Sequence, residues 1–398
     1  MNLRHKIKLH LSKSARQYCA KAAGIQRFAY NWAKEESDIY YKEHKKTISV
    51  ADLVKKFTQI KDAQFPWVRE VTKCAPQYGI HNYCDARERF FRKLGKFPKF
   101  HKKWKHRDSF HIELNSVGIK GKRIKIPRFG WVKMWETVRF PGKVKSVTIF
   151  RHADDWFASV LVDVDPSYQY PHTCKNQAAV VGIDLGLIDF VTMSDGQTIA
   201  APKFYRKMER KLRMAHKKLD RCVKGSSNKE KARKKLAKLY QKSGNQRSHF
   251  SHDLSSKIVR EHGKIGMETL GLTGLVKNRR VSKSFYDAAL GTFVDQIKYK
   301  SVLADSKLIQ VSKNFPSTKM CSTCNHVREH MSLDVRSWTC DHCNTAHDRD
   351  MNAALNLHKF ALEYRENPNA CGDAVRPRKP RFPRRVSAKQ ESTESSNL

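Results

Sequence analysis

Four of the ten cysteines form two C-x2-C pairs separated by fifteen residues, Cys321, Cys324, Cys340 and Cys343. Each pair can present two thiolates to one tetrahedral ion at about 2.3 Å, which is typical of a structural zinc site; a redox dithiol is the alternative. Asn325 and Asn344 follow the pairs, and asparagine is the residue that best replaces glycine where φ is positive. Trp338 is expected to form the small core of this zinc ribbon. Four cysteines saturate the ion, so the nearby histidines are expected at the surface: His326, His330, His342 and His347.

Three carboxylates stand where an acid is unexpected in so basic a chain. Asp184 interrupts V-V-G-I-D-L-G, Glu268 interrupts I-G-M-E-T-L-G, and Asp350 precedes M-N-A-A-L-N. A buried carboxylate without a partner would cost several kcal/mol. Taken singly, Asp350 could cap a helix and Glu268 could pair with one of the many cations. Taken together, two strand carboxylates and one helix-start carboxylate can meet at one edge of an α/β sheet.

Three such carboxylates can hold two divalent cations. Two cations about 3.5–4 Å apart stabilise the attacking and leaving oxygens of phosphodiester hydrolysis. Oxygen ligands favour Mg²⁺ or Mn²⁺ over zinc. The predicted chemistry is therefore metal-dependent cleavage of a nucleic acid, as in nucleases with an RNase H-like fold.

The charge of the chain agrees with a polyanionic partner. The 398 residues carry a formal net charge of +41, from 79 Lys and Arg against 38 Asp and Glu. A hydrophobic fraction of 39% is enough for folded cores. No apolar run reaches the length of a membrane span, and the N-terminus lacks the apolar stretch of a secretory signal. The six remaining cysteines are scattered singly, as in a reducing compartment, so a cytoplasmic, nucleoid-associated prokaryotic protein without a membrane partner is expected.

The densest positive charge lies in residues 203–247, which hold 18 Lys and Arg against three acids. Leu212, Leu219, Leu236 and Leu239 are spaced for helices, and the sequence G-S-S-N at 225–228 breaks them. A solvated helical hairpin is one interpretation of this segment. We favour a face that follows a phosphate backbone, because the repulsion among so many cations requires counter-anions.

The rest of the chain predicts a series of short elements. Alternating and helical patterns indicate a strand at 6–11, helices within 15–45 and 50–100, and antiparallel strands within 110–165. Two strands joined by a turn are expected at 178–196, then a strand at 264–270, a helix at 292–303, a strand at 308–312 and a helix at 350–364. The Pro-rich basic tail is expected to be disordered.

These motifs together resemble the TnpB family, the transposon-encoded relatives of type V CRISPR effectors. The resemblance is carried by G-I-D-L-G-L-I-D-F-V-T-M-S-D-G, I-G-M-E-T-L-G-L, C-S-T-C…C-D-H-C and H-D-R-D-M-N-A-A-L-N, in that order. It reaches the N-terminal half through Q-R-F-A-Y-N-W and G-K-F-P-K-F. The chain departs from the family in lacking the usual proline-containing turn after the first strand and in the asparagines that follow the cysteine pairs.

The resemblance implies a multidomain α+β protein in which an RNase H-like (RuvC) nuclease contains an inserted zinc ribbon. The implied boundaries are a split wedge β-barrel at 1–45 and 106–172, a helical recognition domain at 46–105, a split RuvC-like nuclease at 178–312 and 346–370, a zinc ribbon at 313–345 and a basic tail at 371–398. It implies an RNA-guided DNA endonuclease that binds a transposon-derived guide RNA and target double-stranded DNA and uses a target-adjacent motif.

The same resemblance assigns the site residues. Asp184, Glu268 and Asp350 match the three catalytic, Mg²⁺-binding acids of the family. Asp350 is chosen over Asp348 because it directly precedes the M-N-A-A-L-N helix. Arg336 matches a position near the active site, where it would steady charge on the scissile phosphate; a structural role within the ribbon is the alternative.

Three other functions stay open at this point. A guide-directed DNA-binding repressor would share the fold but would be expected to lack active-site acids. A transposase that joins DNA ends would use the same three acids. A structural RNA- or chromatin-binding protein would not need carboxylates within apolar strands.

Overall fold

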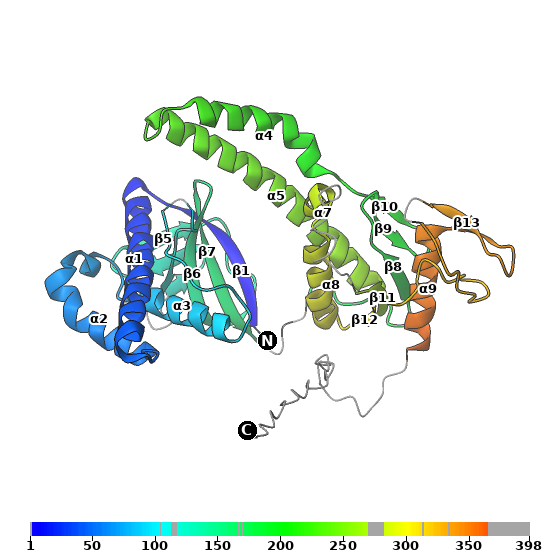
Figure 1. Cartoon of the computed structure of the whole chain (residues 1–398), viewed down its shortest axis with the longest axis horizontal. Helices are drawn as coiled ribbons and strands as arrows, with labels where there is room; N and C mark the ends of the chain where they lie inside the picture. The colour runs from blue at the N-terminus through cyan, green and yellow to red at the C-terminus, as the bar shows by residue number, and fades with distance from the viewer. Residues whose placement is uncertain are drawn as a thin grey trace, which may run out of the picture.

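The computed structural model describes residues 2–103, 105–112, 118–165, 168, 170–269, 282–312, 314–332 and 335–364. Figure 1 shows an N-terminal half in blue to cyan beside a C-terminal half in green to orange, with two long helices extending from the second half over the first. The predicted tail at 371–398 lies outside the described residues. Within the described ranges, no helix is both long and apolar enough to cross a membrane.

The N-terminal half is built on a seven-stranded sheet in the order β2-β6-β7-β1-β5-β4-β3. The first strand joins its two parts, because residues 2–8 pair with β7 and residues 9–10 pair with β5, both antiparallel. Buried and exposed residues alternate along these strands, which is why the period-two pattern predicted them. The strands are β1 (Asn2–His10), β2 (Ser109–Ile112), β3 (Gly118–Lys120), β4 (Arg123–Ile126), β5 (Gly130–Met134), β6 (Gly142–His152) and β7 (Asp155–Val164).

Helices pack against this sheet and share its core. The helices are α1 (Lys13–His44), α2 (Val50–Gln64), η1 (Pro66–Glu70) and α3 (Cys74–Phe91). Ser12 begins α1 by accepting a hydrogen bond from the backbone N–H of Ala15 at 3.2 Å. One cluster of buried residues runs from Ile7 to Val164 and includes Leu53 and Ile80 of the helical segment. Among the described residues, the helical segment 46–105 therefore shares one hydrophobic core with the strands around it.

The C-terminal half contains a five-stranded sheet in the order β10-β9-β8-β11-β12. The two strands and turn predicted at 178–196 are confirmed, and a short third strand extends them. The strands are β8 (Val180–Asp184), β9 (Asp189–Met193), β10 (Thr198–Ala200), β11 (Lys264–Glu268) and β12 (Lys307–Val311). β8, β11 and β12 run parallel, whereas β9 and β10 are antiparallel to their neighbours.

Helices cover both faces of this sheet (Figure 1). One face packs on α5 (Ser227–Glu261) and α8 (Leu290–Ala304), through a core that includes Val181, Ile258 and Phe293. The other face packs on α9 (Arg349–Glu363). The helix α7 (Ser282–Ala288) and the two-stranded sheet of β13 (Ser337–Thr339) and β14 (Ala346–Asp348) complete the described elements.

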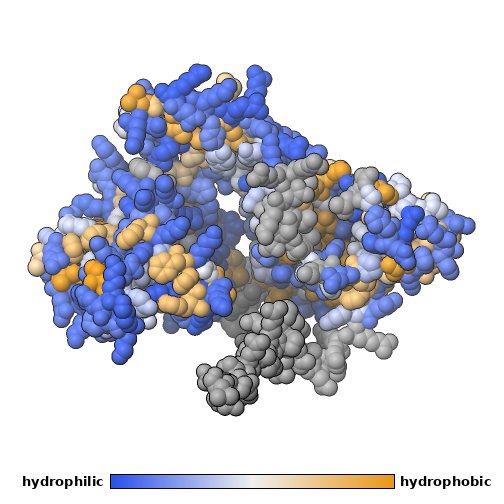
Figure 2. Space-filling model, in the orientation of Figure 1, coloured by the Kyte–Doolittle hydropathy of each residue, from blue (hydrophilic) through white to orange (hydrophobic). Residues whose placement is uncertain are grey.

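The basic segment forms the predicted helical hairpin of α4 (Phe204–Arg221) and α5. Ser226 caps α5 by accepting from the N–H of Lys229 at 3.1 Å. The hairpin has its own small core, which contains the predicted leucines, Leu212 and Leu236 fully and Leu219 and Leu239 in part. Figure 2 shows that hydrophilic side chains cover most of its visible surface. The exposed face therefore carries the charge, as a phosphate-binding face requires.

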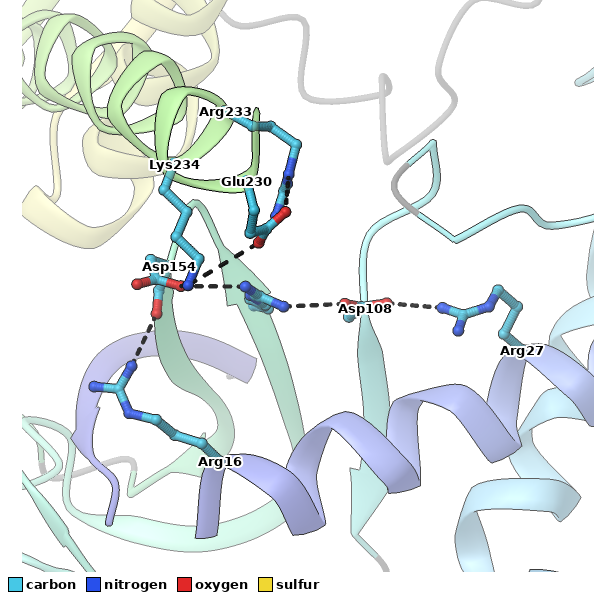
Figure 3. A network of polar contacts seen from close by, with 8 residues as sticks. Arg16, Arg27, Asp108, Asp154, Glu230, Arg233 and Lys234 are labelled. Atoms are coloured by element: carbon cyan, nitrogen blue, oxygen red, sulfur yellow. Dashed lines mark hydrogen bonds and ion pairs between the residues drawn. The ribbon is translucent and has the colours of Figure 1, made fainter. Parts of the chain in front are cut away.

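Alternating charges connect this hairpin to the N-terminal half (Figure 3). Lys234 Nζ of α5 lies 3.4 Å from Oδ1 of Asp154, in the turn between β6 and β7. Arg151 lies 3.2 Å from Asp154 and 3.8 Å from Asp108. Asp108 in turn accepts a 2.7 Å hydrogen bond from Arg27 of α1. Because these pairs are partly buried, they are screened less than surface pairs and hold α5 against the first half.

A buried lysine joins α5 to α8. Lys300 Nζ donates to the backbone carbonyl of His252 at 2.6 Å and to the hydroxyls of Ser255 and Ser256 at 2.7 Å each. Burial lowers the pKa of Lys300 to about 8, although the charge of Asp253 acts in the opposite direction. The folded state therefore disfavours the charged form of this lysine.

This lysine makes the stability of the protein depend on pH. The folded pKa lies below the ordinary value of 10.5, so the penalty is complete below pH about 8 and disappears as the pH rises toward 10.5. We expect the free energy of unfolding to rise, relative to that of Lys300→Met, by up to about 3 kcal/mol over this interval. Urea unfolding at a series of pH values measures it, with Lys298→Met, an exposed site on the same helix, as the control. Parallel pH profiles for the wild type and Lys300→Met would contradict the assignment.

Candidate active site and zinc site

Two of the predicted acids lie at the carboxyl ends of neighbouring parallel strands. Asp184 is the last residue of β8, and Glu268 is the last residue of β11. The register pairs Ile183 with Met267, which places the two carboxylates at the same level of the sheet. Since parallel strands end at a common edge of the sheet, Asp184 and Glu268 lie close in space although they are far apart in sequence.

A pair of glycines brings α9 onto this part of the sheet. Gly182 and Gly266 are register partners in β8 and β11. A Cβ atom on Gly182 would lie 2.0 Å from the backbone oxygen of Ala354, and one on Gly266 would lie 2.4 Å from that of Leu357. The backbone of α9 therefore rests directly on the two strands, an approach that only glycine permits.

The first turn of α9 supplies the third acid. Asp348 is the N-cap, and its Oδ1 accepts from the backbone N–H groups of Asp350 and Met351 at 3.1 and 2.9 Å. Asp348 is thus occupied in starting the helix, whereas the carboxylate of Asp350 is not used for capping. This division supports the choice of Asp350, and it shows that the helix-cap interpretation belongs to its neighbour.

The electrostatics of Asp184 show that the charges of the other two acids act on it. Burial and the negative charges of Asp350 and Glu268 together raise the pKa of Asp184 to about 7, against the backbone N–H of Leu185 and the charge of Arg349. Burial likewise raises the pKa of Glu268, which a hydrogen bond from Ser317 partly offsets. Mutual repulsion of this kind is what a bound cation relieves. The donor set, oxygen from three carboxylates, fits Mg²⁺ or Mn²⁺.

Two arginines border the acids. Arg336 Nη1 lies 3.1 Å from Oδ2 and 3.5 Å from Oδ1 of Asp350, so the predicted arginine does reach the candidate site. Arg349 favours the ionised form of Asp184, and its backbone N–H donates to the carbonyl of Arg336 at 2.8 Å. The two arginines therefore place positive charge beside the carboxylates. A bound phosphate would bring further negative charge to the same place, and this positive charge would stabilise it.

The four predicted cysteines converge on one point. Their sulfur atoms all lie within 4.8 Å of one another. The distances from Cys321 to Cys343 and from Cys324 to Cys340 are 3.6 and 3.7 Å between sulfurs. A tetrahedron with zinc–sulfur bonds of about 2.3 Å has edges of about 3.8 Å, so the cluster fits zinc. Hydrogen bonds with Thr345 lower the pKa of Cys343, which favours its thiolate, whereas burial and contacts with the other three thiols raise the pKa of Cys324.

The surroundings of the cysteines confirm most of the expectations for the ribbon and correct one. Asn325 and Asn344 have φ values of 61° and 55°, as predicted, and Trp338 packs against the cysteines. His347 was expected at the surface, and this is wrong. It is buried against Trp338, and its Nε2 lies 3.0 Å from the sulfur of Cys321, because β14 pairs with β13 and turns the imidazole inward. The other three histidines of the ribbon are exposed.

Two asparagines of α9 attach the segment that carries the four cysteines to the C-terminal half. The side-chain amide of Asn352 donates to the carbonyl of Met320 at 2.7 Å, and its oxygen accepts from the N–H of Ser322 at 2.8 Å. Asn356, one turn later, donates to the carbonyls of Met320 and Ser317 at 2.6 and 2.8 Å. Both asparagines are buried, so these bonds form away from water. The ribbon is thereby positioned to hold Arg336 against Asp350.

Removal of zinc should therefore affect both stability and cleavage. Cys321→Ser is expected to reduce bound zinc from about one ion per chain to none, because one ligand of a closed four-thiolate site is lost. A lower melting temperature and at least a tenfold loss of DNA cleavage should follow as Arg336 and the loop at Ser317 lose their support. Metal analysis and thermal melting measure this, with Cys174→Ser, outside the cluster, as the control. Unchanged zinc content in Cys321→Ser would contradict the assignment.

Sequence reasoning missed three residues that contact the predicted sites. They are Arg349, Ser317 and His347. Arg349 stands between two acids in H-D-R-D, which is a usable signal for a cation beside a carboxylate site. Ser317 has no such signal, because its approach to Glu268 depends on how the loop before the ribbon docks on α9.

Three parts of the chain match known family models. Residues 159–279 match the OrfB IS605 family model, described as a probable transposase, residues 291–357 match a Cas12f1-like TNB domain, and residues 1–46 match the helix-turn-helix domain of the OrfB IS605 type. In this structure residues 2–44 form a strand followed by one long helix.

The relatives span nearly the whole chain. A protein of Streptomyces pristinaespiralis that is named as an RNA-guided DNA endonuclease is 31% identical over 94% of this chain and 92% of its own length. The protein InsQ of Escherichia coli (strain K12), named likewise, is 24% identical over 97% of each chain. A solved Cas12f1–sgRNA–target DNA complex shares the fold, with a TM-score of 0.51 and 16% identity over 86% of this chain and 81% of that chain. The chain belongs to the TnpB family.

Proposed function

We propose that this protein is an RNA-guided DNA endonuclease of a transposon, which cleaves target DNA by two-metal-ion phosphodiester hydrolysis. The observation that carries the proposal is the placement of Asp184 and Glu268 at the ends of β8 and β11 and of Asp350 in the first turn of α9, which packs on these strands. The names of the full-length relatives support the guide RNA and the DNA target. The net charge of +41 suits a protein that holds two nucleic acids.

The sheet order supports the finer assignment of the nuclease half as RNase H-like, or RuvC-like. Three antiparallel strands are followed by two parallel strands, and the acids lie at the carboxyl ends of β8 and β11. We extend the proposal to a nuclease at 178–312 and 346–370 with the ribbon at 313–345 inserted before its last helix. Residues 1–45 and 106–172 would form the wedge barrel, and 46–105 the helical recognition unit that contributes to the same core.

The residues of the site have separable roles in this mechanism. Asp184, Glu268 and Asp350 would hold the divalent cations, which when bound supply a nucleophilic water and stabilise the charge on the scissile phosphate. Arg336 orients the carboxylate of Asp350 and adds positive charge on the side from which the phosphate would approach. The charge of Arg349 favours the ionised form of Asp184, and Ser317 donates to Glu268, so both contacts partly offset the effect of burial on these acids.

The decisive experiment is to purify the protein from cells that carry its transposon and to sequence the RNA that accompanies it. A discrete RNA is expected, and DNA that matches its variable end should be cut in Mg²⁺ but not in EDTA. Binding should weaken steeply with salt, because many phosphate contacts release many counterions. Cleaved DNA that becomes joined to a second DNA, without a discrete RNA, would assign the same acids to strand transfer. Guide-dependent binding without cleavage would indicate a repressor.

A further inference from the structure

An unusual surface follows the end of α3. Residues 89–107 contain nine Lys and Arg and no Asp or Glu. Large apolar side chains in this segment are exposed to solvent by 37% to 65%: Phe90, Phe91, Leu94, Phe97 and Phe100. None of them belongs to the core of the N-terminal half or packs on it as a partly buried neighbour. Four of them, Phe90, Phe91, Phe97 and Phe100, are called the phenylalanine patch below.

The rings of the phenylalanine patch form one connected cluster. The ring centroid of Phe90 lies 5.5 Å from that of Phe91 and 5.2 Å from that of Phe97. Lys34 Nζ links the rest, at 5.2 Å from the centroid of Phe97 and 4.8 Å from that of Phe100. Figure 2 shows that apolar side chains are set among hydrophilic ones on the visible surface of the N-terminal half.

The patch is held in place by the fold. Lys34 is buried and pairs with Asp38 at 2.5 Å, so the cation beneath two of the rings is fixed. Lys93 has a φ of 59°, and the turn that it forms is closed by a 2.8 Å hydrogen bond from the N–H of Leu94 to the carbonyl of Arg89. Fixed rings lose little conformational entropy when a ligand binds, which favours binding.

Positive charge surrounds the patch and is available to a ligand. Arg92 pairs with Glu88. Within the described part of the chain, no ion pair involves the other four cations of residues 89–99: Arg89, Lys93, Lys96 and Lys99. A protein or lipid surface without negative charge would use the apolar area alone, whereas a nucleic acid strand uses both features. Unpaired bases stack on aromatic rings, and the phosphates between them contact the interleaved cations.

The constant exposure of this patch favours RNA over DNA as the occupant. A contiguous apolar surface is a liability in water unless a partner covers it. Under the RNA-guided function proposed above, the guide stays bound, whereas the target DNA comes and goes. We propose that the phenylalanine patch binds unpaired nucleotides of the guide RNA, with the bases stacked on its rings and the phosphates on Arg89, Lys93, Lys96 and Lys99.

The test compares the wild-type full chain with a Phe91→Leu, Phe100→Leu variant. Leucine keeps most of the apolar area but removes the aromatic face, so loss of binding reports stacking. The probes are single-stranded oligoadenylate and a blunt RNA duplex, with affinity measured by fluorescence anisotropy at several salt concentrations. We expect affinity for oligoadenylate to fall about tenfold or more. Affinity for the duplex and the slope of the salt dependence should stay unchanged. Trp131→Leu, an exposed ring outside the patch, is the matched control.

A second measurement uses the unaltered chain. Ultraviolet crosslinking of the RNA that co-purifies with it should attach RNA to a peptide that contains residues 89–100. The yield of that RNA should fall several-fold in the double variant. Equal affinity of wild type and variant for oligoadenylate, or no crosslink in this peptide, would overturn the proposal. A patch-dependent affinity for oligodeoxyadenylate with an unchanged RNA yield would assign the patch to DNA and overturn it as well.

The two proposals can fail separately. The oligoadenylate affinity reports the patch, whereas the sequence of the recovered RNA and the cleavage of matching DNA report the nuclease function. Loss of stacking in the double variant with no discrete RNA in the wild type would refute the RNA-guided function and, with it, the guide as occupant.

Discussion

Asp184→Asn is expected to abolish Mg²⁺-dependent DNA cleavage, with a rate at least about 10³-fold below that of the wild type. Asparagine keeps the volume of aspartate but removes the negative charge that, in the proposed mechanism, would hold a cation between β8 and the first turn of α9. The negative charges of Asp350 and Glu268 act on this acid and raise its pKa. Affinity for RNA and for target DNA should stay largely intact, because these depend on the basic surfaces. Single-turnover cleavage and a binding assay on the same preparation measure the two effects.

Two matched substitutions make this result specific. Asp350→Asn should be as damaging as Asp184→Asn, because it removes another ligand of the same site. Asp348→Asn should leave cleavage within a few-fold of the wild type, since asparagine caps a helix about as well as aspartate. Cleavage at the wild-type rate by Asp184→Asn, or loss of cleavage only in Asp348→Asn, would show that the acids are wrongly assigned.

Gly182→Ala is expected to have the second large effect, on both stability and activity. The added Cβ would lie 2.0 Å from the backbone oxygen of Ala354 and 2.3 Å from the backbone nitrogen of His358, and neither atom can move without the helix. We expect a loss of about 3 kcal/mol or more in the free energy of unfolding, at the upper end of the range for overpacked cores. Any folded protein should also cleave slowly, because displacement of α9 carries Asp350 away from Asp184. Chemical unfolding and cleavage by the folded fraction measure these effects.

The control for this substitution is another glycine of the same half. Gly244 lies within α5, and a Cβ at that position meets no atom within 4 Å. Gly244→Ala should therefore raise stability by about 0.5–1 kcal/mol, because alanine is the better helix former. Wild-type stability and cleavage in Gly182→Ala would mean that α9 does not rest on β8 as the structure has it.

Much of the candidate site could be predicted because its signals are local. The spacing of the four cysteines restricts the ligand geometry within a few residues, and the sulfurs do meet as predicted. Asp184 and Glu268 can be recognised in the sequence because acids are rare inside apolar strands, where a buried carboxylate without a partner is unfavourable. The alternation of the strands and the leucine spacing of the hairpin report which face of each element is buried, and the strands and helices occur where these patterns indicate.

The role of His347 could not be predicted in the same way. The position of a histidine beside four cysteines is compatible both with the surface and with burial against the sulfurs. Only the pairing of β13 with β14 turns His347 toward the sulfur of Cys321. The continuous core of the first half is a similar case. Periodicity separates a helical segment from strands but does not show that Leu53 and Ile80 pack with them in one cluster.

The sequence by itself determined the chemistry of this protein: which acids, which thiolates and how much positive charge are available. It also determined the local elements, since propensity and periodicity act over a few residues. Only the tertiary structure decided the register that pairs Gly182 with Gly266, the helix that rests on them, and the position of Arg336 at Asp350. The physical reason is that these contacts join segments far apart in the chain. Their geometry depends on how whole surfaces pack, which the pattern of each segment alone does not specify.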